Sequence, residues 1–152
     1  MRELRLATEL DFDFFYTIKS EEKNMYWTGH DCRPNKDTLK DWFINKLVPD
    51  SDRDIFFYFI DSKAVGYSYA IYNENFIETA VSVLMRYEGL GYGKEIVRET
   101  LEYCRGKEEN LNFHAWIFEN NIPSIKVHTS VGFTKTEDYK MLATKKMYKY
   151  EC

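Results

Sequence analysis

The sequence predicts a mixed α/β domain, with a largely antiparallel sheet of six to seven strands flanked by about four helices. Three strand-like runs separated by short polar turns, between residues 55 and 85, favour an antiparallel meander. The segment 91–105 repeats apolar residues at helical spacing, and a strand-like run follows it at 111–118. A strand, a helix and a second strand in this order form a crossover, so we expect 111–118 to pair in parallel with 76–85.

The other elements are predicted from spacing and from the residues that end them. Alternating polar and apolar residues predict strands, and apolar residues three and four apart predict helices. Thr8, with Asp11 three residues later, is typical of a helix N-cap, and Gly29 and Pro34 mark a loop. The expected elements are a strand at 2–7, a helix from 8 to about 18, a loop at 24–34, a helix at 37–47, strands at 55–60, 64–72 and 76–85, a helix at 91–105, a strand at 111–118, a helix at 123–131, and strands at 133–136 and 141–148. This order, β-α-α-β-β-β-α-β-α-β-β, fits a single domain over residues 1–152.

Composition narrows the class of protein. Hydrophobic residues make up 44% of the 152 residues, which is enough for a packed core. The net charge is −4, and no basic stripe is interleaved with aromatic residues, so nucleic acid is not an expected partner. Cys32, Cys104 and Cys152 are odd in number and lack Cys-x-x-Cys spacing, which argues against a disulfide framework or a zinc site. Without a leader-like N-terminus or a membrane-length apolar run, we expect a cytoplasmic protein with no membrane partner and no metal.

A glycine-rich segment, Tyr-Glu-Gly-Leu-Gly-Tyr-Gly-Lys at 87–94, lies between a predicted strand and the best predicted helix. Such a turn leaves backbone N–H groups unpaired at the positive end of a helix dipole, which suits a phosphate. A Walker loop is excluded, because Glu88 replaces its first glycine and Glu95 follows Gly93-Lys94 where Ser or Thr is needed. A dinucleotide fingerprint is excluded by the Gly-x-Gly-x-Gly spacing and by the strands that precede the loop.

The loop resembles that of the GNAT N-acetyltransferase superfamily, Gln/Arg-x-x-Gly-x-Gly/Ala after the fourth strand. Residues 88–93 occupy these positions, and the departure is Glu88, since an anion near a pyrophosphate is unfavourable unless it points away. A later family motif resembles Asn-x-x-Ser/Ala-x-x-x-Tyr-x-x-x-Gly-Phe. This sequence matches it with Asn121, Ser124, His128, Gly132 and Phe133. The two motifs and the element order carry the resemblance over nearly the whole chain, whereas a bare glycine turn capping a helix would explain only the first motif.

The resemblance implies acetyl-CoA as co-substrate and a primary amine as acceptor. In that family the fourth and fifth strands splay apart, and the pantetheine arm enters the gap between them. Backbone groups near Val83, Leu84 and Met85 are then expected to pair with the arm. The remaining expected coenzyme contacts are the pyrophosphate-binding amides of Gly89, Leu90, Gly91, Tyr92, Gly93 and Lys94, the positive charge of Lys94, and the arm contacts of Asn121 and Ser124.

Direct attack of an amine on a thioester in a ternary complex requires a base, stabilisation of the oxyanion and a proton for the leaving thiolate. The family commonly has Tyr at the position of His128, so the resemblance implies His128 as the acid, provided that it is protonated. A histidine that packs or caps its helix is the alternative. Glu78, on the strand leading to the loop, is the expected base, with Glu119 and His114 as other candidates and a solvated strand Glu as the alternative.

The aromatic, polar-tipped segment containing Tyr26, Trp27 and His30 resembles the wall of an acceptor pocket in the branch with ribosomal-protein and aminoglycoside acetyltransferases. The alternative is a loop folded onto the core. Acidic residues nearby would suit a cationic acceptor, although charge runs are commonly just solvated. The compact chain lacks an extended groove, which favours a small-molecule amine over a peptide N-terminus.

The sequence leaves two alternative functions and the oligomeric state undecided. A non-catalytic acyl-CoA-binding sensor or interaction module is the main alternative, because Glu88 and His128 both depart from the family pattern. A different donor, such as succinyl-CoA, would need a wider pocket past Met85. The alternating strand 141–148 is the kind of edge strand through which a homodimer can form.

Overall fold

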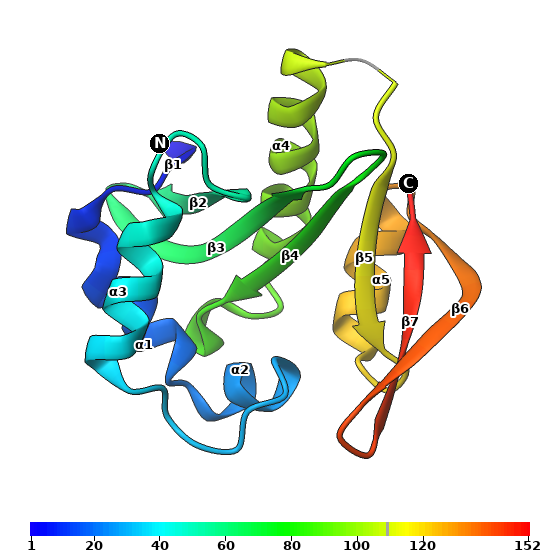
Figure 1. Cartoon of the computed structure of the whole chain (residues 1–152), viewed down its shortest axis with the longest axis horizontal. Coiled ribbons are helices and arrows are strands. Elements are labelled where there is room, and N and C mark those ends of the chain that lie inside the picture. The colour runs from blue at the N-terminus through cyan, green and yellow to red at the C-terminus, as the bar shows by residue number, and fades with distance from the viewer. Residues whose placement is uncertain (109) are drawn as a thin grey trace.

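The computed structural model describes residues 1–108 and 110–152, which form one seven-stranded sheet with five α-helices (Figure 1). The strand order is β1-β2-β3-β4-β5-β7-β6, and only β4 and β5 pair in parallel among the described strands. The strands are β1 (Arg2–Leu6), β2 (Arg53–Ile60), β3 (Lys63–Tyr72), β4 (Ile77–Val83), β5 (Phe113–Phe118), β6 (Thr134–Leu142) and β7 (Lys145–Glu151). The helices are α1 (Phe12–Lys19), α2 (Glu22–Trp27), α3 (Lys36–Lys46), α4 (Tyr92–Lys107) and α5 (Ile122–Val131), with 3-10 turns η1 (Glu9–Asp11) and η2 (Met85–Tyr87). The predicted mixed, largely antiparallel fold is confirmed.

Two hydrophobic cores lie on opposite faces of the sheet. On one face α4 packs against β3, β4 and α5, and its Val97 and Leu101 contact Phe56 of β2 within one buried cluster. On the other face α1 and α3 bring Phe15 and Phe43 against the β2 and β3 side chains. The helices occupy opposite faces because consecutive strand residues point to opposite sides of the sheet.

Three details of the sequence-based prediction are wrong. Residues 24–34 were expected to form a loop, but α2 begins at Glu22, and only at Gly29, with φ of 82°, does the chain turn away. This six-residue helix is too short to show an apolar period, and it depends on contacts with β4 described below. The apolar spacing that predicted a helix from residue 8 begins at Leu10, but Leu10 is 94% exposed while Phe12 is buried. Thr8 does begin this region, and its N–H donates to the Asp11 carboxylate at 2.8 Å.

The third error concerns the last two strands. Residues 141–148 were expected to form one strand, but the chain reverses within them, where Ala143 has φ of 55°. The two resulting strands form a hairpin in which β6, not β7, is the edge of the sheet. Tyr139 and Met141 of β6 are 58% and 56% exposed. The exposed apolar edge expected from the sequence therefore exists, but it lies on β6.

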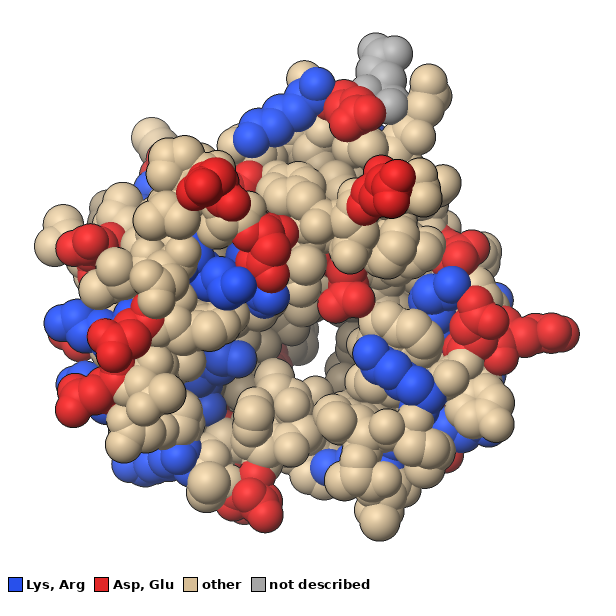
Figure 2. Space-filling model, in the orientation of Figure 1, with Lys and Arg blue, Asp and Glu red and all other residues tan. Residues whose placement is uncertain are grey.

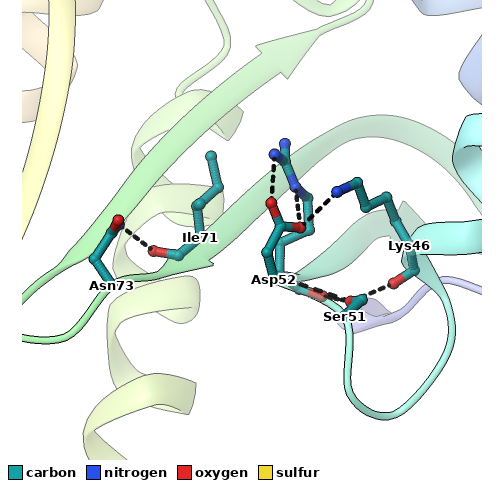
Figure 3. A network of polar contacts seen from close by, with 6 residues as sticks. Lys46, Ser51, Asp52, Ile71 and Asn73 are labelled. Carbon is teal, nitrogen blue, oxygen red and sulfur yellow. Dashed lines mark hydrogen bonds and ion pairs between the residues drawn. The ribbon is translucent and has the colours of Figure 1, made fainter.

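The connection from α3 into β2 is fixed by a polar network around Asp52 (Figure 3). The Asp52 carboxylate accepts hydrogen bonds from the Arg53 guanidinium at 3.1 and 3.2 Å and from Lys46 Nζ at 2.8 Å. These two cations lower the pKa of Asp52 to about 2. Ser51 Oγ donates to the carbonyl of Lys46 at 2.7 Å, which ties the end of α3 to the turn.

Candidate functional site

The parallel pair β4–β5 opens into a cavity. The two strands are in register only at Ile77–Phe113 and Glu78–His114, and beyond these pairs they diverge (Figure 1). A cavity of about 740 Å³ occupies the gap, and the molecule is visibly hollowed there (Figure 2). Its lining comes from the ends of α1 and α2, from β3, β4, the glycine loop, β5 and α5. From the roles expected from the sequence, we call the part lined by the loop 88–93, the open edge of β4 and α5 the coenzyme half. The part lined by α1, α2 and the β3 face is called the acceptor half.

The glycine loop has the conformation that the sequence predicted. Gly89 and Gly91 have φ of 75° and 86°, a region that favours glycine. Gly91 is the N-cap of α4. None of the amides from 89 to 94 donates to an acceptor among residues 1–108 and 110–152. Six unpaired donors at the positive end of a 16-residue helix form a suitable cradle for a pyrophosphate.

Side chains around this loop contribute less than its backbone. Gly89, Gly91, Tyr92 and Gly93 line the cavity. Leu90 is 60% exposed and lies outside the lining. The Lys94 side chain is also exposed outside it. The expected contribution of these two residues is therefore restricted to their amides.

The open backbone edge of β4 differs from the expected one. The sequence placed it at Val83, Leu84 and Met85, but the Leu84 N–H donates to Val65 O and the Met85 N–H to Glu21 Oε1, both at 2.9 Å. The strand ends at Val83, and Met85 begins the turn η2. In an antiparallel pair alternate residues bond to the partner strand, so with Leu84 facing β3, Val81 and Val83 face the gap. The structure thus moves the expected backbone contacts from Leu84 and Met85 to Val81 and Val83.

Helix α2 is attached to the end of β4 and to the glycine loop. Glu21 Oε1, which accepts from Met85 N–H, also accepts from Asn24 Nδ2 at 2.9 Å, and Asn24 Nδ2 lies 3.3 Å from Val83 O. Lys23 forms an ion pair with Glu88. Glu88, the departure from the family loop, is therefore directed toward α2, where Lys23 compensates its charge.

Helix α5 brings the second motif to the cavity. Asn121 is its N-cap, with Oδ1 accepting from Ser124 N–H at 3.3 Å, and Asn121, Ser124 and His128 all line the cavity. His128 is only 3% exposed, and its ring packs edge-on against Phe133. Gly132, with φ of 112°, ends the helix and lets the chain turn into β6.

The protonation of His128 follows from its contacts. Burial lowers its pKa, against a smaller opposing effect of the Ser124 carbonyl, so the imidazole is neutral near pH 7. Nδ1 lies 2.8 Å from Ser124 O, which can only accept, so Nδ1 carries the proton. Nε2 is then an unprotonated acceptor. This geometry suits a base better than the acid expected from the sequence.

The other acid–base candidates lie outside the cavity lining. Glu78 is half-buried at the closed end of the gap between β4 and β5. On its face of β4, the cavity lining begins only at Ala80, two residues later. His114 stacks on Phe76 and lies 3.4 Å from Glu151, and burial lowers its pKa. Glu119 is exposed. A base role for Glu78 stays a prediction, since it would require a water molecule between the Glu78 carboxylate and an amine in the cavity.

The acceptor half contains one of the three expected residues. Trp27 lines the cavity and packs against Phe118. Tyr26 is 42% exposed, with Lys145 Nζ 3.3 Å from its ring centroid, and His30 is exposed. Neither lines the cavity.

Sequence reasoning missed several lining residues of the acceptor half on α1, α2 and β3. They include Lys19, Lys23, Tyr67 and Tyr69, whereas Thr28 belongs to the segment expected to form the acceptor wall. The two tyrosines had a usable signal, because alternating aromatic residues in a predicted strand indicate one covered face. Lys19 had none, because a lysine in the last turn of a helix is common.

Comparison with protein families places the chain. A family model of the acetyltransferase (GNAT) domain matches residues 2–134. The chain belongs to the GNAT acetyltransferase family. The prediction of an acetyl-CoA-dependent acetyltransferase is thereby confirmed at the level of the family. Comparison with curated proteins found no match.

Solved structures show the same fold at low sequence identity. The aminoglycoside acetyltransferase AAC(6')-Ib in complex with coenzyme A has a TM-score of 0.84 at 14% identity, covering 100% of this chain and 94% of that one. Spermidine N-acetyltransferase from Vibrio cholerae, in complex with CoA and spermine, has a TM-score of 0.84 at 15% identity, covering 99% and 94%. Ribosomal-protein-alanine N-acetyltransferase from Brucella melitensis has a TM-score of 0.80 at 20% identity, covering 99% and 98%.

Over residues 1–108 and 110–152, no group of three or more His, Cys, Asp or Glu side chains is placed to hold a metal ion. Within the same residues, no helix combines the length and the apolar character needed to cross a membrane.

Proposed function

We propose that this GNAT-family protein transfers an acetyl group from acetyl-CoA to the primary amine of a small molecule, by direct attack in a ternary complex. The observation that carries the proposal is the row of unpaired amides at 89–94, four of whose residues line the cavity between β4 and β5. A plain helix-capping turn would require neither the open gap nor the second motif beside it. Both halves of the cavity are continuous, so donor and acceptor can be held at the same time.

The residues of the coenzyme half fit acetyl-CoA, which supplies the activated acetyl thioester when bound. The amides of 89–94 hold the pyrophosphate, and Lys126 of α5, which lines the cavity, adds a positive charge on the same side. The gap-facing backbone groups of Val81 and the N–H of Val83 pair with the pantetheine amides as an added strand would, since Val83 O already accepts from Asn24. Asn121 uses Oδ1 to cap α5 and keeps its Nδ2 group for the arm.

We assign the proton transfers to His128. Its neutral ring accepts a proton from the attacking nitrogen at Nε2, so the N–H bond breaks as the Nε2–H bond forms. The same proton then passes from Nε2 to the departing sulfur, which leaves His128 neutral again. The low pKa of His128 favours this role, because a base must be unprotonated before it acts. The Nδ1 contact with Ser124 O fixes the ring for both steps.

A small acceptor fits the site better than a peptide chain. Helix α2 is attached to the end of β4 by Glu21, Asn24 and Lys23, which narrows the approach to the acceptor half. Named neighbours of the fold include structures with ribostamycin and with spermine, both small amines. These ligands belong to those proteins and support only the size class proposed for this chain.

The test combines coenzyme binding with turnover. Thermal unfolding with excess acetyl-CoA is compared for the wild type, Gly91→Asp and Gly91→Asn. Gly91 has φ of 86° and open space where a Cβ would lie, so the two variants carry the same backbone strain and nearly the same volume, and differ in charge. At about 100 times its Kd, acetyl-CoA should stabilise the wild type by about 2.7 kcal/mol. Gly91→Asp should lose this shift, and Gly91→Asn should retain more of it.

Release of CoA with a panel of primary amines then decides between enzyme and sensor. Acetylated amine formed together with free CoA supports the transferase. Binding of acetyl-CoA without turnover on any amine would favour the acyl-CoA-binding sensor. A thermal shift only with succinyl-CoA would change the donor, and no shift with any acyl-CoA would overturn the proposal.

A further inference from the structure

The acceptor half has an electrostatic character of its own. Three lysines line the cavity, Lys19, Lys23 and Lys126, whereas Glu88 is the only carboxylate among the described lining residues. Glu88 is already paired with Lys23. Lys126 lies on α5, in the coenzyme half. Lys19 is therefore the charge that an acceptor would meet.

Lys19 is held over aromatic rings and has no carboxylate beside it. Its Nζ lies 5.7 Å from the ring centroid of Phe15 and 5.9 Å from those of Tyr67 and Tyr69. Among residues 1–108 and 110–152, no Asp or Glu lies within ion-pair distance of Lys19. Aromatic faces attract a cation weakly and leave its charge uncompensated. Lys19 therefore presents three N–H donors to the cavity without an anionic acceptor.

Tyr69 supplies a second unmet donor at the same place. It lines the cavity and is 7% exposed, and its Oη forms no hydrogen bond of good geometry with the described residues, although the Tyr67 side chain is the polar group next to it. Burial, reinforced by the neighbouring Tyr67, raises the pKa of the Tyr69 hydroxyl, so it stays protonated. A buried hydroxyl without a partner is costly, which indicates an acceptor group on a bound molecule. Tyr69 and Lys19 both offer hydrogen-bond donors to the cavity. The complementary ligand group is one that only accepts hydrogen bonds.

We propose that the acceptor substrate is a small amine that also carries a carboxylate, and that Lys19 Nζ and Tyr69 Oη bind this carboxylate. An ionised carboxylate is an acceptor-only group with two oxygens, which matches two donors from residues that line the same part of the cavity. The inference rests on the proposed transferase function and specifies its substrate class. It also opposes polycationic acceptors, because a second ammonium group would face Lys19 without a carboxylate to bind it.

The test uses amines that differ only in the group far from the nitrogen. β-Alanine, ω-aminobutyrate and ω-aminopentanoate are compared with alkylamines and diamines of matching chain length, and CoA release gives kcat/KM. The wild type should favour the best aminocarboxylate by about tenfold over its alkylamine, the effect of one charge-assisted hydrogen bond. The diamine should be the poorest substrate.

Four variants locate the effect. Lys19→Gln should abolish the preference for the carboxylate, and Lys19→Glu should reverse it toward the diamine. Tyr69→Phe, which keeps the ring, should reduce the preference a few-fold. Lys40→Gln is the matched control, because Lys40 also lies over an aromatic ring, 5.9 Å from Phe12, but outside the cavity. It should leave the preference unchanged.

Binding of the same amines to the CoA complex, measured by calorimetry, separates this inference from the transferase proposal. Turnover of alkylamines and diamines with no charge preference, or a preference that survives Lys19→Gln, would overturn the inference and leave the transferase standing. Lys19-dependent binding of an aminocarboxylate without turnover would support the inference and contradict the transferase. An aminocarboxylate that neither binds nor reacts would overturn the inference.

Discussion

The two halves of the cavity differ in the groups that form them, backbone in one and side chains in the other. The coenzyme half consists mainly of backbone groups, the amides of 89–94 and the gap-facing edge of β4 at Val81 and Val83. The acceptor half consists of side chains from three separate elements, Lys19 of α1, Trp27 of α2, and Tyr67 and Tyr69 of β3. A backbone site tolerates many side-chain changes as long as its glycines remain. A side-chain site can change its ligand through a single substitution, so we expect substrate selectivity to be set in the acceptor half.

The largest expected effect is at His128, which lines the cavity from α5. His128→Phe preserves ring packing against Phe133 but removes Nε2, and kcat should fall by about 100-fold or more. The affinity for acetyl-CoA, measured by calorimetry, should change little. An equal loss of coenzyme affinity would show that His128 supports the coenzyme half instead of proton transfer.

The pH dependence of the rate shows whether His128 acts as a base or as an acid. Because burial lowers its folded pKa, the wild-type rate relative to His128→Phe should rise as pH increases through a value below about 6.5 and then level off. An acid role requires the imidazolium form and predicts a fall over the same range. Stability follows the same linkage, since the folding contribution of the neutral ring is present above about pH 6.5 and is lost as pH falls through the lowered pKa.

The next largest effect, on stability and on the KM for the amine, is expected in the hydrophobic core that supports the acceptor half. Phe15 is fully buried, and its ring lies 4.8 Å from that of Phe43 and 5.2 Å from that of Tyr67. Phe15→Leu should lower the free energy of unfolding by about 1–2 kcal/mol. It should also raise the KM for the amine severalfold, with the Kd for acetyl-CoA unchanged.

The control for Phe15→Leu is the same substitution at Phe56. Phe56 is 1% exposed and packs against Tyr103 on the opposite face of the sheet. Phe56→Leu should cost similar stability without changing the KM for the amine. If both variants raise this KM alike, the acceptor half is not a separately supported unit.

A smaller effect is expected at the attachment of α2 to β4. Glu21→Ala leaves Met85 N–H and Asn24 Nδ2 without their shared acceptor, which should cost about 1 kcal/mol of unfolding free energy. Glu22→Ala, at an exposed neighbouring position, should change the free energy by less than about 0.5 kcal/mol. Chemical denaturation measures both. Equal effects would mean that α2 is held by other contacts.

The smallest effect concerns the ion pair that joins the two halves. Lys23 and Glu88 are each about a third exposed, so their pair contributes no more than about 1 kcal/mol. Lys23→Met leaves an unpaired carboxylate beside the phosphate cradle and should weaken acetyl-CoA binding by about fivefold. Adding Glu88→Gln should restore the affinity, and calorimetry on the four proteins of this double-mutant cycle gives the coupling. Additive effects would show that Lys23 does not compensate Glu88.

Sequence patterns predicted the coenzyme half better than the acceptor half. The glycine loop and the Asn121–Phe133 motif are each a single continuous stretch of sequence, and each was placed on the correct element. The same reasoning put the open edge of β4 two residues too far along, at Leu84 and Met85, because a turn that ends a strand had no sequence signal there. Of Tyr26, Trp27 and His30, only Trp27 lines the cavity, since the six-residue helix α2 sets their directions.

The sequence by itself determined the order of the strands and of the longer helices, the glycine loop and the start of α5. These features depend on conformational preferences of neighbouring residues, such as positive φ at Gly91 and the Asn121 cap. Only the tertiary structure decided that Lys19 meets Tyr69, that Lys23 pairs with Glu88, and that His128 carries its proton on Nδ1. Such contacts join residues distant in the chain or depend on burial, and packing between elements, not local preference, fixes them.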